Sequence, residues 1–262
     1  MSVSPSSADL GDLVSRLRAA GCVFAEDEAA LIVETAQDAA EVEAMAGRRV
    51  SGMPLEYVLG WASFRGLRIQ VDPGVFVPRR RTEFLVEEAL RVTALGAVVV
   101  DLCCGAGALG AAVAAERAVS LYAADIELAA VRCAERNLAP WQGAVSQGDL
   151  YDALPVDLRG RINVLLSNVP YVPTDEIRLL PPEARLYEPR VTLDGGPDGL
   201  SILRRVVADA PNWLAPGGHV FVEMSERQAP AGRDVLTEHG LTARIVVDDD
   251  LGANVVHGIY RP

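Results

Sequence analysis

The sequence predicts an α/β fold in which helices cover both faces of a mostly parallel sheet, with a small helical domain before it. Short apolar runs alternate with helical patterns from residue 97 onward, an alternation typical of parallel strands. A glycine-rich turn, Gly105–Gly110, follows the first of those runs. The chain closes with two apolar runs joined by a short link. This ending predicts a terminal hairpin that adds an antiparallel strand to the sheet.

Length and charge bound the class of protein. At 262 residues, half of them hydrophobic, the chain is long enough for one large domain and a small one. The 24 basic and 36 acidic residues give a net charge of −12, which argues against a protein that grips nucleic-acid phosphates. The apolar runs are too short to span a membrane, and the N-terminus shows no secretion signal. We therefore expect a cytoplasmic enzyme.

Cysteine and histidine usage argues against disulfides and metal. The four cysteines lack paired metal-ligand spacing, and the three histidines are scattered. We expect reduced thiols and no metal site. Disorder is expected only at the serine-rich start, Ser2–Ser7.

The first eighty residues predict three helices and a strand pair. Leu10, Leu13 and Leu17 recur at helical spacing before Gly21, where that helix should stop. Two more helices are expected over residues 26–37 and 39–49, and a strand pair over 64–71. A helix over 82–91 follows, with Thr82 as its cap. The predicted division is a helical domain at 1–60, a hairpin linker at 61–80 and the main domain at 81–262.

Beyond the helix over 82–91, the main domain is expected to hold seven strands and three further helices. The strands should cover residues 97–102, 120–125, 144–147, 162–167, 219–223, 244–247 and 255–260. The helices should cover residues 107–117, 127–138 and 198–213.

The glycine turn allows two readings. A G-x-G-x-x-G motif with Asp125 twenty positions after Gly105 also describes a dinucleotide site, because an acid there accepts hydrogen bonds from ribose hydroxyls. Asp101, at the end of the first strand, discriminates, since its charge would repel a pyrophosphate. A methyltransferase instead uses such an acid to hold the turn and the water around a cationic, amino-acid-bearing ligand. Asp149 lies where an adenine amino group would bind. These residues favour a methyltransferase.

The segment Asn168–Tyr171 predicts an acceptor site. It follows a predicted buried strand, and ligands of open α/β sheets bind at the carboxyl ends of strands. An Asn-x-Pro-aromatic turn places an amide oxygen beside a backbone carbonyl, and the proline stiffens it and has no N–H to offer. Two such acceptors suit a planar amino or amide nitrogen, against which the ring of Tyr171 can pack.

With these motifs the chain resembles the protein N5-glutamine methyltransferases of the PrmC/HemK family, which methylate the Gly-Gly-Gln glutamine of peptide-chain release factors. The segments that carry the resemblance are residues 54–60, 74–79, 82–83, 105–110, 168–171 and 188–200. It implies a Rossmann-like class I S-adenosylmethionine-dependent methyltransferase domain and a substrate-recruiting helical N-terminal domain. A protein substrate is implied, with no grip on nucleic acid and no membrane.

The motifs, together with the resemblance, imply a set of site residues. The catalytic residues are expected to be Asn168, Val169, Pro170 and Tyr171. The residues expected to bind S-adenosylmethionine are Phe76, Pro78, Arg79, Thr82, Asp101, Cys103, Gly105, Gly107, Asp125, Ile126, Asp149, Leu150 and Asn168. For Glu223, which matches a family acid, we expect a structural salt link.

Two departures from the family pattern leave the acceptor open. Val169 replaces the first proline of Asn-Pro-Pro-Tyr, and Arg80 and Arg81 replace a proline and an acid at the pocket rim. The backbone carbonyl that serves the chemistry is kept at Val169. The leading interpretation is methylation of a protein glutamine. The alternatives are a small-molecule methyltransferase of secondary metabolism and a cofactor-binding partner protein without catalysis.

Overall fold

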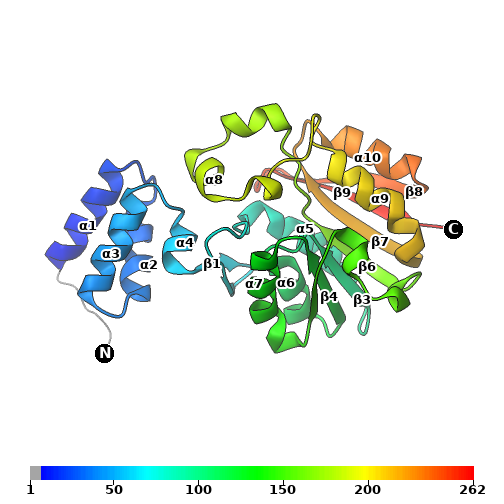
Figure 1. Cartoon of the computed structure of the whole chain (residues 1–262), viewed down its shortest axis with the longest axis horizontal. Coiled ribbons are helices and arrows are strands. Elements are labelled where there is room, and N and C mark those ends of the chain that lie inside the picture. Colours follow the sequence, from blue (N-terminus) through cyan, green and yellow to red (C-terminus); the bar gives the residue numbers. More distant parts are fainter. Residues whose placement is uncertain (1–6) are drawn as a thin grey trace.

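The computed structural model describes residues 7–262, and four helices form its N-terminal part (Figure 1). The expectation for the serine-rich start lies outside the described residues, except for Ser7, where the first helix begins. The side chains of Leu17, Ile32 and Met45 are buried together between these helices. The helices are α1 (Ser7–Ala19), α2 (Ala25–Thr35), α3 (Ala39–Val50) and α4 (Leu55–Leu59).

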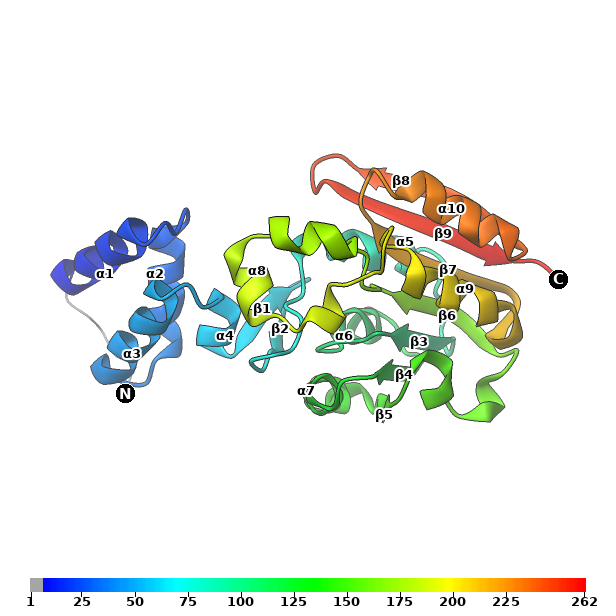
Figure 2. The ribbon, with the colours of Figure 1, turned by 45° about the horizontal axis from the view of Figure 1, so that its top comes forward.

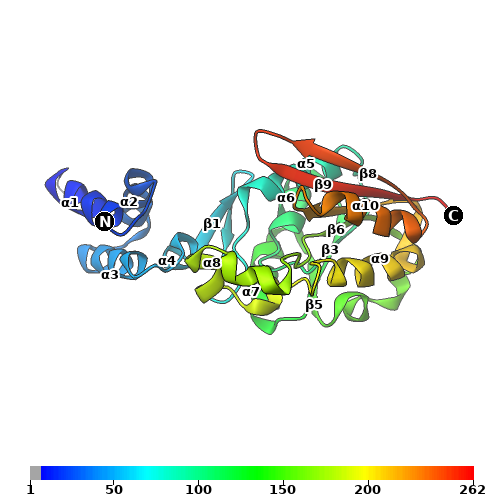
Figure 3. The ribbon, with the colours of Figure 1, turned by 90° about the horizontal axis from the view of Figure 1, so that it is seen from above.

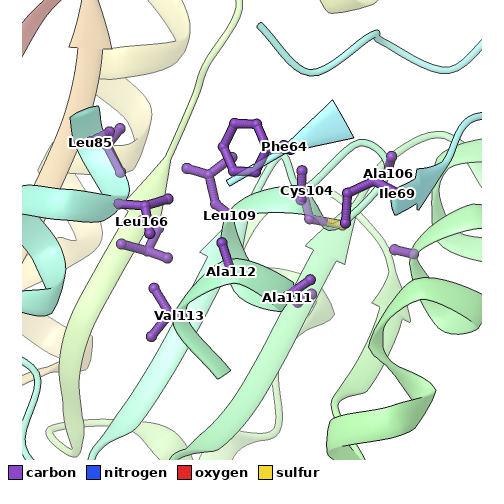
Figure 4. Packing of buried hydrophobic residues seen from close by; sticks show 14 of the residues in the cluster. Phe64, Ile69, Leu85, Cys104, Ala106, Leu109, Ala111, Ala112, Val113 and Leu166 are labelled. Carbon is purple, nitrogen blue, oxygen red and sulfur yellow. The ribbon is translucent and has the colours of Figure 1, made fainter. Parts of the chain in front are cut away.

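A hairpin connects the helical part to the sheet. Its strands β1 (Trp61–Phe64) and β2 (Leu67–Gln70) pair antiparallel around Arg65 and Gly66. Both turn residues have positive φ, 46° and 75°, as a two-residue type I′ turn requires. Trp61 packs against the helical core, whereas Phe64 is buried in the core of the larger part (Figure 4). The hairpin is therefore anchored on both sides.

The larger part is built on a seven-stranded sheet with the order β5-β4-β3-β6-β7-β9-β8. The last strand, β9, lies between β7 and β8 and is antiparallel to both, while the other neighbours pair in parallel. The seven predicted strands and the antiparallel terminal strand are confirmed. The strands are β3 (Val98–Leu102), β4 (Ser120–Asp125), β5 (Ala144–Gln147), β6 (Ile162–Ser167), β7 (Leu214–Met224), β8 (Leu241–Asp248) and β9 (Ala253–Tyr260).

Helices cover both faces of this sheet (Figures 2 and 3). Alternate residues of β3 point to opposite cores, so Val99 packs with α5, α6 and α7, and Val100 packs with α9 and α10. These helices are α5 (Glu83–Leu90), α6 (Ala108–Glu116), α7 (Leu128–Leu138), α9 (Ser201–Trp213) and α10 (Ala229–Glu238). A short helix, α8 (Pro182–Tyr187), lies in the connection between β6 and β7.

Three local features differ from the expectation. Thr82 precedes α5, but its hydroxyl caps nothing, because a 3-10 turn over Arg80–Thr82 leads into the helix and buries that group. Helix α10 was not predicted; its segment contains Pro230 and Gly232, two residue types of low helix propensity. A proline is acceptable in the first helical turn. An ideal Cβ on Gly232 would lie 2.2 Å from Met224 Sδ, so the glycine serves close packing. The short helices α4 and α8 were also not predicted.

Candidate active site

The glycine turn after β3 has backbone conformations that non-glycine residues rarely adopt. Cys103, Gly105 and Gly107 all have positive φ, and Cys103, at 57°, does so as a non-glycine residue. The buried carboxylate of Asp101 accepts a hydrogen bond from the Gly110 backbone N–H at 2.9 Å and so ties α6 to β3. Burial raises the pKa of Asp101 to about 8. Asp101 therefore supports the glycine turn from its buried side.

Asp125 ends β4 and braces the same turn. Its two carboxylate oxygens accept hydrogen bonds from the backbone N–H groups of Gly105 and Glu127, each at 2.9 Å. Burial raises the pKa of this carboxyl. The side chain lines a cleft of about 950 Å³, part of it open to solvent, at the carboxyl ends of β3, β4 and β6. We call this the deep cleft.

Most of the predicted cofactor residues meet in the deep cleft. Those that line it are Phe76, Pro78, Thr82, Cys103, Gly105, Asp125, Ile126, Asp149, Leu150 and Asn168. Three others do not line it. Asp101 is buried below the turn, Gly107 packs its backbone against α7 near Ala134, and Arg79 lies on a neighbouring hollow.

Two details of the deep cleft point to a ligand. Leu150, in the segment after β5, has a φ of 52° and lines the cleft, as does Cys103, whose φ is also positive. Such backbone costs free energy and gathers at functional sites. The Thr82 hydroxyl lines the cleft, is 1% exposed and has no hydrogen-bond partner within the described chain. A buried hydroxyl without a partner is costly unless a bound molecule completes it.

The charge of the deep cleft suits a cation. Its charged lining residues are Asp125, Glu127, Asp149 and Arg205. The one basic group among these four is already paired, because Arg205 Nη2 lies 2.7 Å from Asp149 Oδ2. A pyrophosphate would meet net negative charge here, whereas a sulfonium or ammonium group would be attracted.

The turn Asn168–Tyr171 follows β6 and is held from three sides. Ser167 donates its hydroxyl hydrogen bond to the Leu102 carbonyl at 3.1 Å, which joins the ends of β6 and β3. The Val169 side chain is buried in the core at 1% exposure. Gln228 Nε2 donates to the Tyr171 carbonyl at 2.8 Å. The valine side chain is thus part of the core at the position where the family pattern has a proline.

The motif 194–200 packs against the backbone of this turn. Val172 donates to the Leu193 carbonyl at 3.0 Å, and Gly195 donates to the Val172 carbonyl at 2.8 Å. An ideal Cβ on Gly195 would lie 2.7 Å from the Pro170 carbonyl oxygen, and one on Gly199 would lie 2.2 Å from that of Tyr171. Only glycine allows the two backbones to approach so closely.

A second hollow opens on the other side of Asn168. This outer hollow is lined by the turn, by Arg79 and Arg81 and by the segment around α8, and it shares Phe76, Asn168, Pro170 and Thr192 with the deep cleft. The Asn168 side chain makes no hydrogen bond within the described residues, so its amide is free at the junction. Its neighbours are fixed, because Glu188 holds Arg79 Nη2 at 2.6 and 2.7 Å.

Comparison with known proteins decides the family. Residues 66–179 match the methyltransferase small domain family. A release factor glutamine methyltransferase of Geobacter sulfurreducens is 35% identical over 85% of this chain and 78% of its own length. One from Streptomyces coelicolor is 39% identical over 73% of this chain and 69% of its own. The chain belongs to the release factor glutamine methyltransferase family. It is therefore an S-adenosylmethionine-dependent methyltransferase, as the motifs predict.

Solved structures of this enzyme class share the fold. A methyltransferase from Pyrococcus furiosus superimposes with a TM-score of 0.57 at 15% identity, over 76% of this chain and 91% of that one. The Mtq2–Trm112 complex of E. cuniculi, described as responsible for methylating the eRF1 translation termination factor, gives 0.50 at 21% identity. That match covers 72% of this chain and 99% of that one. At these identities the likeness shows the fold alone.

The methyltransferase deep cleft fits its cofactor. S-adenosylmethionine carries a sulfonium cation, an amino acid, a ribose and a purine. Net negative charge suits the cation, Asp125 offers acceptors for a diol, and the unpartnered Thr82 hydroxyl offers a polar contact. The exposed Ile126 side chain supplies an apolar surface. No group of metal-ligating side chains occurs among residues 7–262, and no helix there is long and apolar enough to cross a bilayer.

Several residues of this methyltransferase site were not predicted from the sequence. Glu127 lines the deep cleft two positions after Asp125, and its place in that loop was a signal. Arg205 reaches the deep cleft from α9. No local sequence pattern indicated this, because its partner Asp149 lies 56 positions away. The salt link expected for Glu223 is present and joins it to Arg81 at 3.0 Å.

Proposed function

We propose that this enzyme methylates the side-chain amide nitrogen of a glutamine in a peptide-chain release factor. The observation that carries the proposal is the free amide of Asn168 at the junction of the deep cleft and the outer hollow. The printed names of the relatives, release factor glutamine methyltransferases, supply the protein class. A membrane or nucleic acid plays no part in the proposal.

In this proposal the deep cleft holds the cofactor. Asp125 would bind the ribose hydroxyls, Asp149 would lie near the adenine and the Gly105 backbone would line the amino-acid end, where the Thr82 hydroxyl gains its missing partner. Asp101 and Gly107 would act indirectly, by shaping the glycine turn. S-adenosylmethionine supplies the electrophilic methyl group.

The outer hollow would hold the glutamine. Its amide nitrogen is a poor nucleophile because the lone pair is delocalised into the carbonyl. Asn168 Oδ1 and the Val169 carbonyl would accept its two N–H bonds, orient the lone pair and stabilise the positive charge that develops. Pro170 keeps the turn rigid, and the Tyr171 ring would pack against the amide plane.

No side chain needs to remove a proton before transfer. Burial and the nearby Glu223 carboxylate raise the pKa of Tyr171 to about 12, so its phenol stays protonated at neutral pH and is no general base. The proton leaves the nitrogen after it has become acidic through methylation. The chain's residues therefore act by orientation and electrostatics.

The test is methyl transfer to a purified release factor. The enzyme, the release factor and S-adenosylmethionine labelled in its methyl group are incubated, and the labelled peptide is sequenced by mass spectrometry. We expect one methyl group on one glutamine, and none on a release factor with that glutamine changed to asparagine. Label in a small organic extract of cells, with none in the protein, would instead support the small-molecule alternative.

A further inference from the structure

Three charged or polar side chains close a triangle at the acceptor turn, and two of them, Arg81 and Tyr171, line the outer hollow. Arg81 Nη2 donates to the Tyr171 hydroxyl at 2.7 Å, and Arg81 Nε donates to Glu223 Oε1 at 3.0 Å. The Tyr171 hydroxyl in turn donates to the same Glu223 oxygen at 3.1 Å. The three residues come from the 3-10 turn before α5, from the acceptor turn and from β7. We call them the tyrosine clamp.

The burial of Glu223 makes the tyrosine clamp depend on the ion pair with Arg81. The Glu223 side chain is 1% exposed, and a carboxylate so buried needs a cation to balance it. Arg81 supplies that cation with an ion pair, and its own side chain is 45% exposed. The second carboxylate oxygen, Oε2, has no partner within the described residues, so the contacts to Glu223 converge on one oxygen. Glu223 therefore sets where both partners lie.

The clamp holds the hydroxyl of Tyr171, whose backbone carbonyl is already held. Gln228 holds the Tyr171 backbone carbonyl at 2.8 Å, while Arg81 and Glu223 hold its hydroxyl. The ring between these anchors can neither swing into the outer hollow nor retreat from it. Arg81 stands where the PrmC/HemK pattern has an acid.

We infer that Arg81 and Glu223 are positioning residues that set the plane of the Tyr171 ring against the acceptor amide. The inference rests on the proposed function, because the ring's partner is the glutamine amide. A fixed ring plane lowers the rotational freedom of the bound amide and raises the fraction of complexes in line for transfer. The effect should therefore appear in kcat and leave cofactor affinity unchanged.

The kinetic test compares Tyr171→Phe, Arg81→Met and the double variant on the release factor. Tyr171→Phe removes only the hydroxyl that the clamp holds. Each single variant should lose about 10-fold in kcat, short of the 10²-fold loss that a misplacement of about 1 Å can cause. The double variant should lose no more than either single one, because both break the same connection. The dissociation constant of S-adenosylmethionine should match the parent's in all three.

Arg80→Met is the matched control. Arg80 is the exposed neighbour, lines neither the deep cleft nor the outer hollow, and makes no ion pair or side-chain hydrogen bond within residues 7–262. The change in charge and length is the same, so its kcat should equal the parent's. A parent-like kcat of Arg81→Met, or losses that multiply to about 100-fold in the double variant, would overturn the inference.

A measurement without substrate separates this inference from the proposed function. Protein labelled with ¹³C at tyrosine Cζ gives a resonance for Tyr171, assigned by its loss in Tyr171→Phe. We expect that resonance to shift in Arg81→Met and to stay in place in Arg80→Met. An unmoved resonance in Arg81→Met contradicts the clamp whatever the substrate. Failure of the parent to methylate the release factor contradicts the proposed function alone.

Discussion

Replacing Gly195 by alanine perturbs the acceptor turn through a single methyl group. The φ angle of Gly195 is not positive, so alanine can adopt its backbone conformation. The added Cβ, however, would lie 2.7 Å from the carbonyl oxygens of Pro170 and Gly199 and 2.8 Å from Gly199 Cα. These are backbone atoms, which cannot rotate away, so the turn itself must shift. Overpacking of this kind costs about 1–3 kcal/mol.

The loss should appear in both stability and activity. Each kcal/mol lowers the melting temperature by about 2–4 °C in a chain of this size. Displacement of Pro170 moves the neighbouring Asn168, so single-turnover methyl transfer should fall on the order of 10²-fold. Calorimetric melting and rapid-quench transfer to the release factor measure the two effects. Affinity for S-adenosylhomocysteine should fall much less than the transfer rate, because only Asn168 and Pro170 of the displaced turn line the deep cleft.

Gly47→Ala provides the control for this change. Gly47 lies inside α3, has no positive φ, and an ideal Cβ there meets nothing within 4 Å. Alanine is the better helix former, so this variant should gain about 0.5–1 kcal/mol and transfer methyl groups at the parent rate. The reasoning is refuted if Gly195→Ala melts at the parent temperature and transfers at the parent rate.

Three further substitutions test other parts of the molecule. Asp125→Ala should weaken binding of S-adenosylhomocysteine by about 1–3 kcal/mol in titration calorimetry, since it would leave buried ribose hydroxyls unpaired; an unchanged affinity would exclude the ribose contact. Burial raises the pKa of Asp101 from 3.8 to about 8, so the parent should lose stability as pH rises through that interval. Asp101→Asn should lack this loss in urea unfolding at several pH values, and parallel pH profiles would contradict it. Arg49→Met should cost about 3–5 kcal/mol in the same assay, because it leaves Glu28, now held at 2.5 Å, buried without a partner. A cost below about 1 kcal/mol would show that solvent reaches Glu28.

The strands of the sheet could be predicted because each is a short apolar run that ends in a polar or glycine-rich turn. The terminal strands 244–247 and 255–260 followed from the short link between them, which excludes a helical crossover. The position of Asn168 followed from its place after a buried strand. Helix α10 escaped because Gly232 lowers helix propensity, and only packing against Met224 explains that glycine.

Contacts between distant segments could not be predicted. Arg81 and Glu223 lie 142 positions apart, and no local pattern pairs them. Arg79 was expected at the cofactor, but its Nη2 donates to both carboxylate oxygens of Glu188 and its side chain lines the outer hollow. Periodicity identifies elements, whereas the direction of an individual side chain depends on which segments the fold brings together.

The central claim is that the Asn168 side chain holds the acceptor amide in line for transfer. The direct measurement is single-turnover methylation of the release factor by Asn168→Ala, with Asn212→Ala as control. Asn212→Ala makes the same change from an amide to a methyl group. Asn212 lies at the end of α9 and lines neither the deep cleft nor the outer hollow.

We predict that Asn168→Ala lowers the transfer rate by about 10²–10³-fold, comparable to the loss of one preorganised oxyanion contact. Its affinity for S-adenosylmethionine should stay close to the parent's, and Asn212→Ala should match the parent in both. Transfer by Asn168→Ala at the parent rate would show that the amide is held elsewhere, and the proposed role of the acceptor turn would be wrong.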